Sequence, residues 1–237
     1  MVARAQGAGH RTLAGIEIFR DTDRESLARI EQRCRWRSFQ PGEAVIERAA
    51  PTHEVHFVVA GGVRVEDQAA SGRVVSFQDI REGGLVGELA AIDGGERSAS
   101  VIAVEPTTTA ALDPRSFLNM LADHPEASLA TMQRLADMVR QASTRIMELS
   151  TVGAHNRVHA EMLRLARERA ASGGESARIS PIPAHNDIAS RVSTTRETVA
   201  RVLSELSKTG LIRRERNALV VPDLPALSEL VERAREA

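Results

Sequence analysis

Three polar residues in one short stretch have the types and spacing of a site for an anion. Residues 87–100 read GELAAIDGGERSAS, and Glu88, Arg97 and Ser98 stand among small and apolar side chains. A carboxylate can accept a hydrogen bond from a sugar hydroxyl, an arginine on the strand that follows can fork onto a phosphate, and a serine can add a hydroxyl donor. If the three side chains converge, they bind an anion that carries a ribose.

The backbone ahead of these side chains could contribute to the same site. Residues 83–89 read GGLVGEL, so that Gly87, Glu88 and Leu89 lead into a short helical turn. The first amides of such a turn lack partners within it, and a helix N-terminus of this kind binds anions. A simpler alternative is a Glu88–Arg97 ion pair that braces the turn. The residues taken alone favour this alternative.

A second group of polar residues lies on a predicted helix near the C-terminus. Residues 194–201 read TTRETVAR, and the apolar side chains of this region repeat with helical spacing. The inward stripe consists of Val199, Val202, Leu203 and Leu206. The side chains that point outward are those of Arg196, Glu197, Ala200 and Arg201.

Outward arginine and glutamate side chains can read DNA bases. An arginine makes a bidentate contact to O6 and N7 of guanine, and a glutamate accepts from the N4 amino group of cytosine. Thr195 and Thr198 carry hydroxyls suited to phosphates. The alternative is a solvated helix face with one Glu197–Arg201 pair.

The elements around that helix predict a winged helix-turn-helix. A helix over 188–192 precedes a polar turn at Ser193 and Thr194, and the helix over 195–209 ends at Gly210, which suits a left-handed cap. Residues 211–221 then alternate around Asn217 like a small hairpin. Two short helices followed by such a wing match the DNA-binding module.

The first half of the chain predicts many short strands. Between residues 39 and 113, the runs AVIE, VHFVVA, VRVE, VVSFQDI, SASVIAVE and TTAAL are separated by glycine-rich turns. This pattern is typical of an antiparallel roll or sandwich. A short helix is expected over 23–33. The fold class is therefore α+β, with an N-terminal antiparallel β-roll and a C-terminal winged helix-turn-helix.

A long helix is expected to begin at Pro125, between the two regions. Its apolar positions follow a heptad pattern, and they are Met132, Leu135, Val139, Ala142, Ile146 and Leu149. The pattern is short enough that two interpretations remain open. The seam either pairs two subunits or packs on its own domain.

Composition narrows the class of protein. The chain of 237 residues is 42% hydrophobic and 27% charged, which is typical of soluble globular proteins. It has no apolar run long enough to span a membrane and no secretory signal, so a cytoplasmic location is expected. The single cysteine, Cys34, excludes an internal disulfide and falls short of an iron-sulfur cluster.

Charge is distributed unevenly along the chain. The net charge is −1, yet residues 1–125 carry 14 arginines against 18 acidic residues, whereas residues 154–237 carry 14 basic against 11 acidic residues. The basic surplus thus lies where the DNA-binding module is predicted. No metal site is expected, because His53 and His56 fall on opposite faces of a probable strand. Nothing resembles a catalytic nucleophile with its base, so no enzymatic activity is expected.

The recognition-helix residues and the 87–99 stretch resemble those of the bacterial cyclic-AMP receptor protein/FNR (Crp/Fnr) superfamily of transcription regulators. The resemblance runs from about Leu13 to Val221. It implies a cyclic-nucleotide-binding β-roll over 13–124, a central dimerisation helix over 125–152 and a winged helix-turn-helix over 153–237. Residues 1–12 have no periodicity and are rich in Gly and Ala, so a disordered tail is expected there.

The resemblance also implies roles for individual residues. In the family, the glutamate matched by Glu88 holds the ribose 2′-hydroxyl, the arginine matched by Arg97 holds the cyclic phosphate, and serine and backbone amides complete the cradle. A Thr-Ser pair that meets adenine is matched by Ala142 and Ser143, with Thr144 following, so that cyclic AMP or cyclic GMP is the expected effector. The matches of Arg196, Glu197 and Arg201 contact TGTGA-like half-sites.

The expected function is that of a homodimeric regulator whose binding to a two-fold symmetric DNA site is controlled by a cyclic nucleotide, with RNA polymerase as a further partner. One alternative is a family member that acts without a cyclic nucleotide or with another ligand, such as a cyclic dinucleotide. Another is a nucleotide-binding module that controls a partner protein.

Overall fold

The computed structural model describes residues 12–48, 50–69, 74–170 and 174–236. The chain divides into two compact units, Met1–Val139 and Arg140–Ala237, and each is described by itself. Of the predicted tail, residues 1–11 lie outside the described part. Thr12 does not belong to a tail, because its Oγ1 donates to Oε1 of Glu31 over 2.9 Å.

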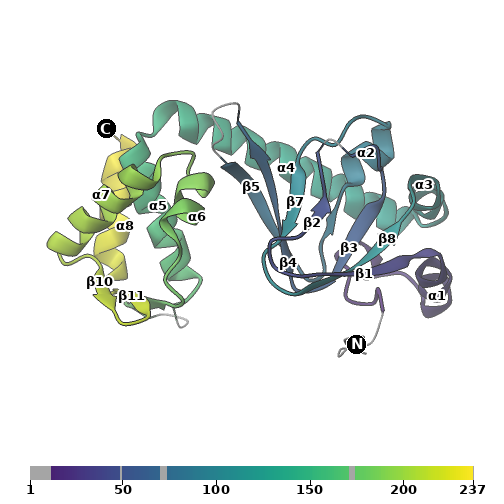
Figure 1. Ribbon diagram of the computed structural model, residues 1–237, viewed down its shortest axis with the longest axis horizontal. Helices are drawn as coiled ribbons and strands as arrows, with labels where there is room; N and C mark the ends of the chain where they lie inside the picture. The colour runs from purple at the N-terminus through teal and green to yellow at the C-terminus, as the bar shows by residue number, and fades with distance from the viewer. Residues whose placement is uncertain (1–11, 49, 70–73, 171–173, 237) are drawn as a thin grey trace, which may run out of the picture. The chain divides into compact units, whose positions relative to one another are not determined.

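The N-terminal unit contains two four-stranded antiparallel sheets, as predicted from the short alternating runs (Figure 1). One has the order β1-β8-β3-β6, formed by Arg35–Phe39, Thr107–Leu112, Val55–Ala60 and Leu85–Val86. The other has the order β2-β7-β4-β5, formed by Ala44–Ile46, Ser100–Ala103, Gly62–Gln68 and Val74–Arg81. Strands β1 and β6 were not predicted, because β1 has no alternating apolar pattern and β6 has only two residues.

Two apolar clusters hold this unit together. One consists of valines, isoleucines and an alanine from both sheets: Val45, Ile46, Val58, Val63, Ile80, Val86, Val101 and Ala103. The other lies between the β1-β8-β3-β6 sheet and the helices, where Phe57 is fully buried between Phe19 and Phe117, at ring-centroid distances of 5.2 and 6.4 Å. This packing fixes the sheets that carry the candidate site.

Two helices of the unit begin at caps that their sequences supply. Helix α1 (Arg24–Arg33) is capped by Asp23, whose carboxylate accepts from the backbone amides of Glu25 and Ser26, and α3 (Pro114–Asp123) is capped by Asp113. A 3-10 turn, η1, covers Glu17–Phe19, and α2 covers Glu88–Asp93. Such caps satisfy backbone amides that have no partner within the helix.

Helix α4 spans Pro125–Thr151, and it begins at the predicted proline. It buries Ala127 and Thr131 against the N-terminal unit. The seam residues Met132, Val139 and Ile146 are 59%, 66% and 64% exposed. The chain itself therefore does not cover them.

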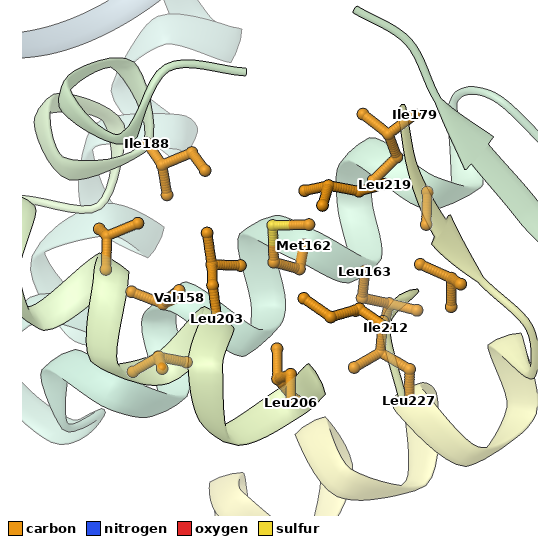
Figure 2. Packing of buried hydrophobic residues seen from close by; sticks show 14 of the residues in the cluster. Val158, Met162, Leu163, Ile179, Ile188, Leu203, Leu206, Ile212, Leu219 and Leu227 are labelled. Atoms are coloured by element: carbon orange, nitrogen blue, oxygen red, sulfur yellow. The ribbon is translucent and has the colours of Figure 1, made fainter. Parts of the chain in front are cut away.

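The C-terminal unit is a helical core with a three-stranded sheet of order β10-β11-β9. Its remaining helices are α5 (Ala154–Arg167), α6 (His185–Arg191), α7 (Arg196–Lys208) and α8 (Leu224–Glu236), and its strands are β9 (Ala177–Ile179), β10 (Arg213–Glu215) and β11 (Ala218–Val221). Figure 2 shows the buried side chains of this core, among them Met162, Ile188 and Leu206.

The helix-turn-helix and wing have the predicted order. Helix α6 begins three residues before the expected position, α7 is followed by Gly210 at φ +79°, and Asn217 lies in the turn of the β10–β11 hairpin. Strand β9 was not predicted, and it completes the sheet by pairing with β11.

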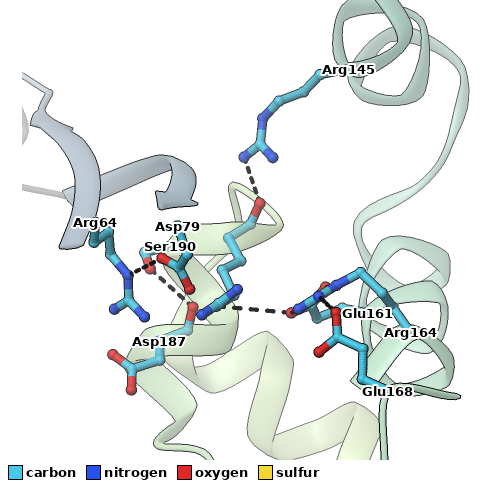
Figure 3. A network of polar contacts seen from close by, with 9 residues as sticks. Arg64, Asp79, Arg145, Glu161, Arg164, Glu168, Asp187 and Ser190 are labelled. Carbon is cyan, nitrogen blue, oxygen red and sulfur yellow. Dashed lines mark hydrogen bonds and ion pairs between the residues drawn. The ribbon is translucent and has the colours of Figure 1, made fainter. Parts of the chain in front are cut away.

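Polar contacts fix the turn between α6 and α7. Arg157 of α5 donates to the carbonyl oxygens of Val192 and Ser193, at 2.9 and 3.3 Å, and Ser193 adopts a left-handed φ of 52°. Arg164 forms a bidentate pair with Glu161, with both distances 2.7 Å, and also contacts Glu168 (Figure 3). Arg157 therefore joins α5 to the turn that precedes α7.

Among the described residues, no helix has the length and apolar character needed to cross a membrane.

Candidate functional site

Gly87 occupies a position that only glycine suits. Its φ is +86°, and a Cβ there would lie 2.6 Å from Nη1 of Arg97 and 2.8 Å from the carbonyl oxygen of Glu54. The left-handed conformation turns the chain from β6 into α2. The glycine thus lets the Arg97 side chain approach the backbone closely.

Arg97 is a buried cation whose hydrogen bonds go only to backbone. It is 4% exposed, Nη1 donates to the carbonyl oxygen of Gly87 over 3.0 Å, and Nη2 donates to that of Glu54 over 2.8 Å. Nε has no hydrogen-bond partner among the described residues. Burial lowers the pKa of Arg97, although arginine stays protonated in proteins. A buried N–H donor that has no acceptor and belongs to a cationic side chain is suited to bind an anion.

Arg97 precedes β7 and does not belong to a strand, contrary to the prediction. Its guanidinium nevertheless donates to the carbonyl oxygen of Gly87, so that it lies beside the start of the predicted anion site.

Glu88 pairs with an arginine that the sequence pattern did not reveal. The carboxylate is 4% exposed, and its Oε1 lies 3.6 Å from Nε of Arg134 on α4. Arg134 Nη2 also donates to the carbonyl oxygen of Leu85 over 2.8 Å, while its Nε makes no hydrogen bond in the described part of the chain. No Glu88–Arg97 ion pair forms within the described residues, so the simpler alternative was wrong.

A cavity of about 300 Å³ connects these groups. Gly87, Glu88, Leu89, Arg97 and Ser98 all line it, so the cassette residues predicted from the sequence do converge. Further lining residues come from the two sheets, from α2, from the segment before β7 and from α4: Ile46, Val65, Phe77, Gln78, Leu85, Val86, Ala90, Ala99, Val101, Arg134 and Met138. Its size is at the lower end of small-molecule sites.

Arg134 and Met138 were missed because they lie outside the heptad seam. Their spacing of four residues puts both on one face of α4, and this spacing is the only signal in the sequence. Ser143 and Thr144 lie further along α4, are exposed, and are not among the residues that line the cavity. Their contact with a base stays a prediction.

The inward and outward side chains of α7 lie as predicted. Val199 and Val202 are fully buried, and Arg196, Glu197 and Arg201 are exposed. No Glu197–Arg201 ion pair forms among the described residues, so both charges remain available to a ligand.

The two threonines and the start of α6 have distinct local roles. Thr195 Oγ1 caps α7 by accepting from the amide of Thr198 over 3.2 Å, and the two hydroxyl oxygens are 3.1 Å apart. Ala184 begins α6 without a side-chain cap. The exposed N-terminus of α7 therefore presents threonine hydroxyls beside Arg196.

The remaining candidate groups are structural. Burial raises the pKa of Cys34 to about 12, which keeps the thiol protonated and unreactive. His56 is buried, and its Nδ1 lies 3.1 Å from Oγ1 of Thr109. The described residues contain no cluster of three His, Cys, Asp or Glu side chains that could hold a metal ion.

Comparison with known proteins identifies the families of two domains. Residues 36–124 match the cyclic nucleotide-binding domain family, and residues 156–230 match the Crp-like helix-turn-helix domain family. The chain is 30% identical over 199 residues to the transcriptional regulator SdrP of Thermus thermophilus, covering 82% of this chain and 93% of the relative. It is 25% identical over 216 residues to a CRP-like cAMP-activated global transcriptional regulator of Mycobacterium tuberculosis, covering 91% and 96%.

Solved structures share the fold. The c-di-GMP responsive global regulator CLP of Xanthomonas campestris has a TM-score of 0.74 at 17% identity, covering 84% of this chain and 99% of that one.

A cyclic nucleotide-binding domain followed by a Crp-like helix-turn-helix defines a DNA-binding transcription regulator. The chain belongs to the Crp/Fnr family, whose members are transcription regulators and not enzymes.

Proposed function

We propose that this protein is a homodimeric transcription regulator whose affinity for DNA is controlled by a cyclic nucleotide, cyclic AMP or cyclic GMP. The observation that carries the proposal is the buried Arg97 with its unpartnered Nε, which lines the same cavity as the buried Glu88. A phosphate and an adjacent ribose hydroxyl are the groups that this pair is suited to bind.

The charges of the cavity match a singly charged anion. Arg97 and Arg134 supply two positive charges, and Glu88 supplies one negative charge. In this proposal Arg97 holds the cyclic phosphate with help from Ser98, and Glu88 accepts from the 2′-hydroxyl. Helix α2 has only 6 residues, so that its dipole contributes little and the arginines carry the electrostatic attraction.

Helix α7 is the proposed reader of DNA. Its exposed Arg196, Glu197 and Arg201 have the chemistry to contact guanine and cytosine edges. Thr195 and Thr198 are proposed to contact phosphates, which position the helix without reading sequence. A two-fold symmetric site follows if two copies bind together, and RNA polymerase is the further partner that the resemblance implies.

Helix α4 is the proposed connection between ligand and DNA binding. It carries Arg134 in the cavity and exposed seam residues such as Val139 and Ile146. If the seam pairs two subunits, Ser143 and Thr144 can complete the base-binding end from that interface. Ligand then shifts the population between two dimer arrangements, and a hundredfold change in DNA affinity needs about 2.8 kcal/mol of differential binding.

Calorimetric titration of the purified protein with cyclic AMP and with cyclic GMP tests the ligand. We expect micromolar binding of one or both, and its loss in Arg97→Lys, because a lysine keeps the charge but not the forked geometry. Arg81→Ala is the matched control, since the Arg81 side chain is 76% exposed and does not line the cavity. Binding that is unchanged in Arg97→Lys would contradict the proposal.

A cyclic dinucleotide is the second candidate ligand. The structurally similar regulator CLP is described as c-di-GMP responsive, and Arg134, whose Nε makes no hydrogen bond among the described residues, is a second cation for a second phosphate. Titration with c-di-GMP under the same conditions distinguishes the two, because only one class of ligand should bind at micromolar concentration.

A further inference from the structure

Phe77 differs from the other phenylalanines of the chain in its surroundings. Phe19, Phe57 and Phe117 are at most 2% exposed and belong to the core, and Phe39 is partly buried against an apolar cluster, whereas Phe77 is 50% exposed. It also lines the cavity that contains Glu88 and Arg97. A large aromatic side chain left half exposed beside a cavity loses part of the stability that burial would give it. A role in binding explains its position.

The backbone directs Phe77 there by an irregularity in strand pairing. In the β4–β5 pair, Val65 is opposite Gln78 and Glu66 is opposite Ser76, so that Phe77 is an extra residue without a partner. An extra residue of this kind is a β-bulge, which locally twists the strand and redirects a side chain, and bulges are common beside binding sites.

The cavity has two chemically different parts. Arg97, Arg134 and Glu88 supply the charged groups, whereas Phe77 is the only aromatic residue of the lining. A cyclic nucleotide has the same division between an anionic cyclic phosphate and an aromatic base. We propose that the base of the bound nucleotide stacks on Phe77, an inference that rests on the proposed function.

Stacking has a consequence for specificity. Every base has an aromatic face, so an aromatic side chain attracts bases without reading their edges. Phe77 therefore supplies affinity to cyclic AMP and cyclic GMP alike. Ala142, which has no polar side-chain atom, adds no hydrogen bond that would separate the two.

Calorimetric titration of the full-length protein with cyclic AMP, cyclic GMP and base-free ribose 3′,5′-cyclic phosphate tests the proposal. In Phe77→Ala we expect both nucleotides to bind roughly 5- to 100-fold more weakly, the range of alanine substitutions at stacked bases. The base-free compound should bind the variant and the unchanged protein equally. Phe77→Trp keeps an aromatic face and should retain nucleotide affinity, whereas Phe77→Leu should lose it.

Val74→Ala is the matched control. Val74 is 38% exposed on the same strand and does not line the cavity, so this variant should bind like the unchanged protein. Thermal unfolding of each variant checks that the fold is kept.

The outcomes separate the two proposals. If the unchanged protein binds none of the three compounds, the proposed function itself fails. If it binds nucleotides and the Ala and Leu variants bind them equally well, only the role of Phe77 is overturned. If Phe77→Ala weakens binding of the base-free compound as much as binding of the nucleotides, the role of Phe77 in stacking is also overturned, because Phe77 would then shape the whole cavity.

Discussion

At the scale of single residues, the charged groups of the cavity are arranged differently from the simplest interpretation of their sequence. Glu88 and Arg97 are close along the chain, yet Glu88 pairs with Arg134 and Arg97 bonds to backbone carbonyls. Because Arg97 is not neutralised by Glu88, its charge remains available to a phosphate. The residue types could be predicted from the sequence, but the partner from α4 could not, since it depends on how that helix packs.

His56 makes the stability of the N-terminal unit depend on pH. Burial lowers the pKa of His56 to about 4, against the opposing effect of Glu54 and with help from Arg37 and Arg97. The unfolded state, with a pKa near 6.5, binds the proton first as the pH falls. The contribution of a neutral His56 to the free energy of unfolding is therefore complete above about pH 6.5. It falls by roughly 3 kcal/mol as the pH is lowered from about 6.5 to 4.

Urea unfolding of the unchanged protein and of His56→Asn across this range checks the prediction. An asparagine keeps a polar group near Thr109 but does not titrate. The variant should lose less stability than the unchanged protein between pH 6.5 and 4. Parallel pH profiles would show that other groups, such as His159, cause the loss, because burial also lowers the pKa of His159.

At the scale of elements, patterns with many repeats were predicted well and short or irregular elements were not. The buried stripe of α7, which includes Val199 and Leu206, gave the correct inward face. Strand β6 has two residues and β9 has three, too few for alternation to be recognised. The bulge that redirects Phe77 has no signature in the sequence, because it arises from pairing between β4 and β5.

Helix α7 should lose sequence discrimination when Arg196 is shortened. In Arg196→Ala we expect the preference for one base pair of the site to fall by about 1 to 3 kcal/mol, because a bidentate contact to guanine is lost. Binding measured with a set of duplexes, each altered at one position, checks this. Lys208→Ala, at the other end of the same helix, is the control and should leave base preference unchanged.

Helix α4 should lose the ability to pair subunits when a charge is placed on its seam. Ile146 is 64% exposed in the single chain, so that Ile146→Asp should leave each unit folded but place a carboxylate in the subunit interface. Sedimentation should then give the monomer mass of 25.7 kDa, and the unchanged protein should give twice that value. Gln141→Asp, also exposed on α4, is the control. A dimer that persists in Ile146→Asp would favour another interface.

At the scale of the whole molecule, the order of the modules was readable from the sequence because each has its own pattern. Strand alternation, a heptad seam and a helix-turn-helix with a wing follow one another along the chain, and the two matched domain families have the same order. What the sequence could not supply was the cavity, since its lining combines residues from two sheets and α4. Long-range packing, which determines this convergence, has no local signal.

The central claim is that nucleotide binding changes affinity for DNA. The most direct measurement is fluorescence anisotropy with a duplex that carries two TGTGA-like half-sites one helical turn apart, titrated without and with saturating cyclic nucleotide at constant salt. We predict at least a tenfold change in DNA affinity for the unchanged protein and none for Arg97→Lys. Equal affinity in both conditions, with the nucleotide site saturated, would contradict the account.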